Sequence, residues 1–91
     1  MSLEPIRKNG YPQADRTAVE DSVIAAVQAN PDHFISAYVA DHRSFGGRYV
    51  CADLFKETFP EYAASPDARN RYNGPVHNSA AVLSAEQFRR V

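Results

Sequence analysis

Three histidines and one cysteine are the side chains best suited to bind a metal ion or to act as a nucleophile. His33 and His42 lie nine residues apart on one predicted helix, which places them about 13 Å apart and half a turn out of phase. They therefore cannot share a metal ion. Cys51 has no second cysteine for a disulfide, and no Cys/His cluster offers a zinc site. We predict no metal site and no cofactor.

Cys51 and His77 each have two interpretations. A thiol becomes reactive beside a cation or a helix N-terminus. Arg48 is the nearby cation, but a lone cysteine is more often a small core residue. His77 stands beside Asn78 and Ser79 at the expected start of the last helix, where it is either a polar site residue or an ordinary helix-entry side chain.

Motifs that hold phosphate groups are missing from the chain. It contains neither G-x-x-x-x-G-K-[ST] nor G-x-G-x-x-G, the loops whose backbone amides cradle phosphates. It also lacks H-E-x-x-H and the G-x-S-x-G nucleophile elbow. The pair Gly46-Gly47 is interpreted as a turn between two helices.

The end of the chain is weakly basic. From residue 66 onward four arginines stand against Asp67 and Glu86, a balance of +2. Arg69 and Arg71 also lie next to Tyr72, and interleaved basic and aromatic side chains can bind single-stranded nucleic acid. This pattern makes nucleic-acid binding an alternative to be weighed.

Residues 32–59 also have the outline of a helix-turn-helix. Its second helix would present four side chains to DNA: Tyr49, Ala52, Asp53 and Lys56. The carboxylates of Asp53 and Glu57 would then repel the phosphates. The whole chain has ten Lys and Arg against eleven Asp and Glu, a net charge of −1. We therefore favour a protein partner and keep nucleic acid as the alternative.

The elements that position these residues belong to one small domain. The chain has 91 residues, of which 44% are hydrophobic and 23% charged, as is ordinary for a soluble globular protein. No apolar run approaches the roughly 18–20 residues of a membrane span, and residues 1–5 have no signal-peptide core. Together with the single cysteine, these features predict a cytoplasmic protein without membrane contact.

The first half of the chain predicts an irregular arm and two helices. Residues 1–12 contain two prolines and a glycine and are expected to form an arm that is not packed. Residues 13–91 are expected to form a single helical domain. A helix follows Thr17, because Thr17 and Glu20 have the spacing of a capping box. Asn30 before a proline ends this helix and caps the next, which ends before residues 44–47.

The second half predicts two or three more helices. One is expected from residue 48 to 58, and a short one from the Ser65 N-cap to residues 72–75. The last runs from residue 76 to the end, and five apolar side chains are expected to face inward: Val76, Ala80, Leu83, Phe88 and Val91. It carries no C-cap, as expected both for a domain cut from a longer protein and for a natural terminus that frays. The fold expected is a small all-α bundle of four to five short helices.

Residues 52–62 read ADLFKETFPEY, and residues 76–83 read VHNSAAVL. In order and spacing these segments resemble zeta-toxin-type kinases, the P-loop phosphotransferases of bacterial toxin–antitoxin systems. The resemblance covers about residues 50–91. It implies that Asp53 is the general base on a substrate hydroxyl, with His77 in support. Asn78 stands where the family has an acidic residue, and residues 35–47 contain no phosphate-binding loop.

These observations predict a non-catalytic accessory or interaction domain of a larger bacterial zeta-toxin-like protein, from toxin–antitoxin or plasmid-maintenance systems. Arg69, Arg71 and Asn78 are the expected partner-binding residues. Without a P-loop lysine nothing in the chain holds a γ-phosphate, so nucleotide is expected only if a P-loop lies outside it. The alternatives are a helix-turn-helix-like nucleic-acid-binding domain and part of a kinase active site with Asp53 and His77.

Overall fold

The computed structural model describes residues 3–91. These residues form five α-helices and one 3-10 turn, and no strand occurs among them. The elements are α1 (Ala14–Ala29), α2 (Pro31–Ala40), η1 (His42–Ser44), α3 (Ala52–Lys56), α4 (Pro60–Ala63) and α5 (Pro66–Arg90). The prediction of a small all-α bundle is confirmed.

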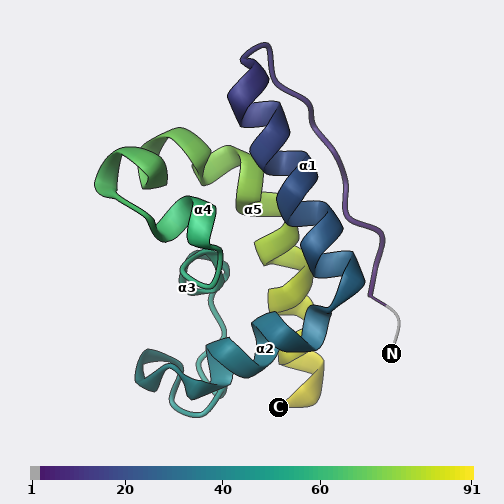
Figure 1. Cartoon of the computed structure of the whole chain (residues 1–91). Helices are drawn as coiled ribbons and strands as arrows, with labels where there is room; N and C mark the ends of the chain where they lie inside the picture. The colour runs from purple at the N-terminus through teal and green to yellow at the C-terminus, as the bar shows by residue number, and fades with distance from the viewer. Residues whose placement is uncertain (1–2) are drawn as a thin grey trace.

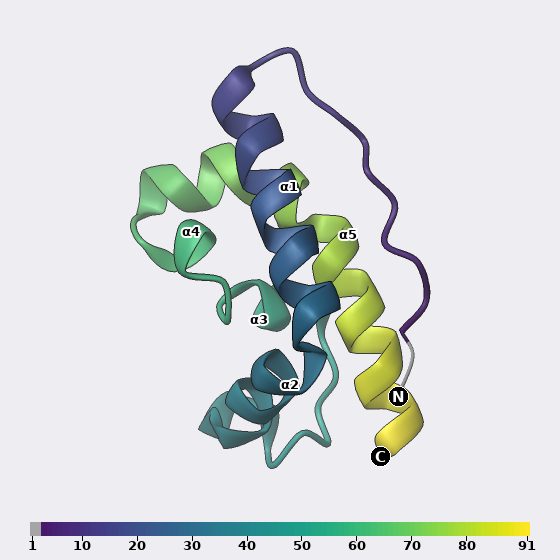
Figure 2. The same cartoon turned by 45° about the vertical axis from the view of Figure 1, so that its right-hand side comes forward.

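Helix α5 is the element around which the others pack, since it contacts all four other α-helices. Helices α1 and α5 lie side by side, with the N-terminal arm on one side of this pair and α3 and α4 on the other (Figures 1 and 2). The core contains apolar side chains from α1, α2, α3 and α5, one from the arm and one from the turn before α4. They are Ile6, Val23, Val27, Phe34, Ile35, Tyr38, Phe55, Phe59, Val76, Ala80 and Leu83. Within it the rings of Tyr38 and Phe55 stack with centroids 3.7 Å apart.

Two predicted helix boundaries agree with the structure. The side chain of Asn30 accepts a hydrogen bond from the amide of His33 and caps α2. Ser65 caps α5 in the same way by accepting from the amide of Ala68, at 3.0 Å. In both cases a proline follows the cap, where its missing N–H costs no helical hydrogen bond.

The predicted break near residues 72–75 is wrong, because α5 continues through Pro75. Proline lacks the N–H that would bond the carbonyl four residues earlier, which is that of Arg71. In the structure the Nε atom of Arg16 in α1 donates to this carbonyl at 3.1 Å. A side chain from another helix thus satisfies the acceptor, and the two expected helices are one helix of 25 residues.

The start of α1 also differs from the prediction. The helix begins at Ala14, so Thr17 and Glu20 lie inside it and form no capping box. The Thr17 hydroxyl instead exchanges two hydrogen bonds of 2.9 Å with the backbone of Tyr11. The buried carboxylate of Glu20 accepts from the amides of Asn9 and Gly10. Both side chains therefore hold the arm against α1 rather than start a helix.

Residues 3–12 of the arm are irregular, as predicted, but the expectation that the arm is unpacked is wrong for them; residues 1–2 lie outside the described part of the chain. The side chain of Ile6 is buried in the core. The carbonyl of Arg7 accepts from Asn78 in α5, and Lys8 pairs with Asp21 in α1. The arm therefore contributes to the core and contacts both long helices.

The helix predicted for residues 48–58 is reduced to the five residues of α3. The buried Tyr38 holds the preceding segment extended, because its hydroxyl donates to the carbonyl of Tyr49 and accepts from the amide of Cys51. These two backbone groups therefore bond to a side chain and not to a helical turn. Lys56, which a helix-turn-helix would present to DNA, is only 2% exposed. Both facts argue against a recognition helix in this segment.

The inward face predicted for the end of the chain is right for its first part and wrong for its last turn. Val76, Ala80 and Leu83 are fully buried. Phe88 and Val91 are 73% and 67% exposed. The expected stripe therefore leaves the core beyond Leu83, where no other helix covers it within the part of the chain that the structure describes. Across residues 3–91, every helix is too short or too polar to cross a lipid bilayer.

Candidate functional site: a polar cleft beside Asp53

Helix α3 places Asp53 and Lys56 one turn apart in opposite environments. The side chain of Asp53 is 82% exposed, whereas that of Lys56 is only 2% exposed. Their Oδ1 and Nζ atoms are 3.1 Å apart. The Nζ atom of Lys56 also donates to Oδ1 of Asn73 in α5, at 2.8 Å. A buried ammonium group, fixed by α5, thus holds one oxygen of an otherwise solvent-facing carboxylate.

Asp53 stands at the edge of a cleft of about 540 Å³ between η1, α3, α4 and α5. Its walls carry mostly polar groups: Arg43, Tyr49, Cys51, Asp53, Leu54, Glu57, Tyr62 and Asn73. The set includes two carboxylates, two phenols, a guanidinium and a thiol. A ligand in this cleft would therefore meet mainly hydrogen-bonding groups and little apolar surface.

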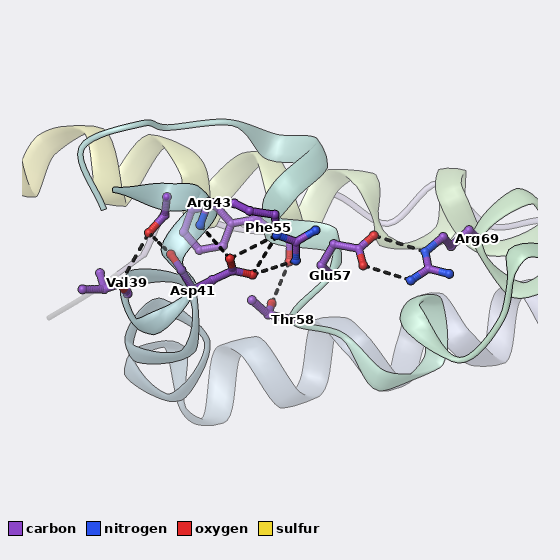
Figure 3. Close-up of polar contacts among 8 residues, drawn as sticks. Val39, Asp41, Arg43, Phe55, Glu57, Thr58 and Arg69 are labelled. Atoms are coloured by element: carbon purple, nitrogen blue, oxygen red, sulfur yellow. Dashed lines mark hydrogen bonds and ion pairs between the residues drawn. The ribbon is translucent and has the colours of Figure 1, made fainter. Parts of the chain in front are cut away.

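Two of the charged side chains on the wall are already paired within the chain (Figure 3). Arg43 bonds both carboxylate oxygens of Asp41, and this hydrogen bonding lowers the pKa of Asp41 to about 2. Arg69 bonds both carboxylate oxygens of Glu57, at 3.1 and 3.2 Å, and its own pKa is raised by that contact. Asp53 is therefore the carboxylate that the cleft presents most openly.

The phenol of Tyr49 interacts with the thiol of Cys51, whereas the phenol of Tyr62 is set apart by its burial. A hydrogen bond with Cys51 raises the pKa of Tyr49, and burial raises the pKa of Tyr62. Cys51 itself is half-buried. Because Arg43, the cation on the wall, is bound to Asp41, the cleft does not offer the thiol the unpaired positive charge that activates a cysteine.

The expected partner-binding residues all have contacts inside the chain. Arg69 links α5 to Glu57, and Arg71 links α5 to Asp15 through both carboxylate oxygens. The amide of Asn78 donates to the carbonyl of Arg7 at 3.0 Å. These contacts tie the turn after α3, the start of α1 and the arm to α5. A role in partner binding stays a prediction for all three residues.

The structure does not join His77 to Asp53. His77 is exposed on α5, four residues or about 6 Å along the helix axis beyond Asn73. Neither a hydrogen bond nor an ion pair connects it to Asp53 in the described chain. The proposed support of Asp53 by His77 therefore stays a prediction, and the direct support comes from Lys56.

The i, i+3 spacing of Asp53 and Lys56 on α3 brings their two side chains together. Asn73 could not be predicted from local spacing, because it lies 17 residues beyond Lys56, in α5. Tyr49 and Tyr62 also line the cleft, although neither was predicted as a catalytic or partner-binding residue. Their exposure depends on the extended segment before α3 and on the short α4.

No protein-family profile and no characterised protein matches this chain in sequence. Within residues 3–91, His, Cys, Asp and Glu side chains do not gather in any group of three or more that could hold a metal ion. The chemistry of the cleft is therefore inferred from the geometry of its side chains.

Proposed function

We propose that the chain is a non-catalytic helical interaction domain that docks onto the P-loop domain of a zeta-toxin-like phosphotransferase. The observation that carries this proposal is Phe88, which is 73% exposed beside a hollow of about 510 Å³. Small side chains line most of that hollow: Val50, Ala52, Ala81, Ser84 and Ala85, with Phe88 and Arg89 at one end. Exposed apolar surface of this kind is typical of protein contact sites.

The hollow adjoins the Asp53 cleft. The backbone at Cys51 is extended, and successive side chains of an extended segment point to opposite sides. Tyr49 and Cys51 line the cleft, whereas Val50 lines the hollow. A domain seated on the hollow would therefore reach the edge of the cleft, where it could supply the phosphate-binding loop that this chain lacks.

The choice of a zeta-toxin-like partner is supported by the two segments that resemble that family. The first segment spans α3 and most of α4, the second lies within α5, and both short helices pack against α5. The hydrogen bond from Lys56 to Asn73 joins them next to Asp53.

The test begins with sequencing the source gene outward from both ends of these codons. A P-loop domain found in the same or an adjacent frame is then produced separately and titrated with this chain. Phe88→Ser should weaken the binding at least tenfold, because it removes an apolar anchor. Phe45→Ser is the matched control, since Phe45 is also 73% exposed but does not line the hollow. Equal affinity of both variants would reject the docking surface.

A second candidate function assigns Asp53 the part of general base in the assembled protein. The favouring observation is an 82% exposed carboxylate held in place by a buried lysine. With the P-loop domain present, Asp53→Asn should abolish phosphoryl transfer while the circular dichroism spectrum and the binding affinity stay unchanged. Asp67→Asn is the control, because Asp67 is an exposed carboxylate remote from the cleft lining. ATP turnover by this chain alone would contradict both candidates.

A further inference from the structure

A second, more enclosed pocket lies between α1, the start of α2 and the start of α4. It has a volume of about 370 Å³. It shares no lining residue with the Asp53 cleft or with the Phe88 hollow: Val23, Ala26, Asn30, His33, Phe34, Phe59, Pro60 and Glu61. The volume is within the range of small-molecule sites in proteins.

The floor of this pocket is apolar and rigid. Val23 and Phe59 are 1% exposed and Phe34 is 7% exposed, so all three belong to the core. The rings of Phe34 and Phe59 lie 5.3 Å apart at an angle of 57°. A small aromatic or branched alkyl group could pack against these two rings.

The rim carries one charge, the carboxylate of Glu61. Its hydrogen-bond partner is the hydroxyl of Ser22, at 3.3 Å, and none of the ion pairs in the described chain includes Glu61. No lysine or arginine lines the pocket. The other polar side chains at the rim are Asn30, whose oxygen caps α2, and His33.

We propose that this pocket binds a small primary amine with an apolar body. The body packs on Phe34 and Phe59, and the ammonium group pairs with the half-buried carboxylate of Glu61. Ring faces close to the ammonium add attraction, because the negative face of an aromatic ring attracts cations. The charge of the rim selects against carboxylates and phosphates of the same size.

The probe is 2-phenylethylamine, compared with 2-phenylethanol, which has the same ring and chain length without the charge. Binding to the intact chain is followed by NMR. The amine should shift the resonances of Val23, Phe34 and Phe59 in a saturable way, with an affinity about tenfold above that of the alcohol. Equal affinities, shifts elsewhere in the protein, or no saturable shift at millimolar amine would overturn the proposal.

Two variants separate charge from shape. Glu61→Gln keeps the shape of the rim and should reduce the affinity for the amine to that for the alcohol. Ala26→Leu fills the pocket from an exposed helix position and should abolish binding of both probes. Ala25→Leu is its control, since Ala25 is exposed on α1 and does not line the pocket. Unchanged amine binding in either Glu61→Gln or Ala26→Leu would also overturn the proposal.

Discussion

The Nε atom of Arg16 donates a hydrogen bond of 3.1 Å to the main-chain carbonyl of Arg71, the acceptor that Pro75 leaves without a helical donor. The same guanidinium lies 4.4 Å from the ring centroid of Tyr11, so it also holds the end of the arm. One side chain of α1 therefore supports both the long helix and the arm.

Replacing Arg16 should destabilise the fold by about 1 kcal/mol, because Arg16→Met leaves the Arg71 carbonyl without its donor. Urea unfolding measures the loss. Arg7→Met is the control, since it changes an exposed arginine whose carbonyl, not its side chain, makes the contact with Asn78. In a Pro75→Ala background, where residue 75 can donate to the Arg71 carbonyl, Arg16→Met should cost clearly less. If Arg16→Met lowered the stability equally in both backgrounds, Arg16 would not be replacing the donor that Pro75 lacks.

Replacing Glu20 should release the arm. Glu20 is 1% exposed and accepts from the amides of Asn9 and Gly10, so Glu20→Leu leaves two donors without their acceptor. We expect a loss of about 1–3 kcal/mol and faster hydrogen exchange at those two amides. Asp21→Asn, which removes only the exposed pair with Lys8, should cost less than about 1 kcal/mol. Unchanged exchange in Glu20→Leu would show that the arm is held by other contacts.

Replacing Asn73 and replacing Lys56, the two partners of the hydrogen bond beside Asp53, should affect stability to different extents. Asn73→Leu leaves the buried Lys56 ammonium with Asp53 as its remaining partner, and we expect a loss of about 1–3 kcal/mol. Lys56→Met removes the charge and keeps an apolar chain of similar length, so its cost should be smaller. Chemical unfolding of both variants shows which substitution lowers the free energy of unfolding more. A larger loss in Lys56→Met would mean that the ammonium stabilises the fold on balance.

At low pH the protein should lose the stability that the Asp41 carboxylate contributes to the fold. The hydrogen bonds from Arg43 lower its pKa from 3.8 to about 2 in the folded protein. Its contribution is therefore present above about pH 4 and is lost as the pH falls toward about 2. Asp41→Asn should lower the melting temperature at about pH 5, and the gap to the wild type should close between about pH 4 and 2. An NMR titration of the Asp41 carboxyl carbon with a midpoint near its ordinary value would contradict this.

Local patterns alone predict the helical class and the boundaries with short-range causes. The caps at Asn30 and Ser65 could be predicted because cap and capped amide are three residues apart. The apolar spacing of Val76, Ala80 and Leu83 likewise predicts a buried face. The pairing of Asp53 with Lys56 also has a short-range cause, since one helical turn brings the two side chains together.

Only the tertiary structure decided where helices continue, where they stop and which polar groups are buried. Helix α5 passes Pro75 because Arg16 comes from 55 residues away, and α3 starts late because Tyr38 occupies the backbone of the segment before it. Lys56 is buried because Asn73 meets it from α5. In each case a backbone or charged group finds its partner on another element. Sequence periodicity records the neighbours along one helix, but such partners become neighbours only when the helices pack.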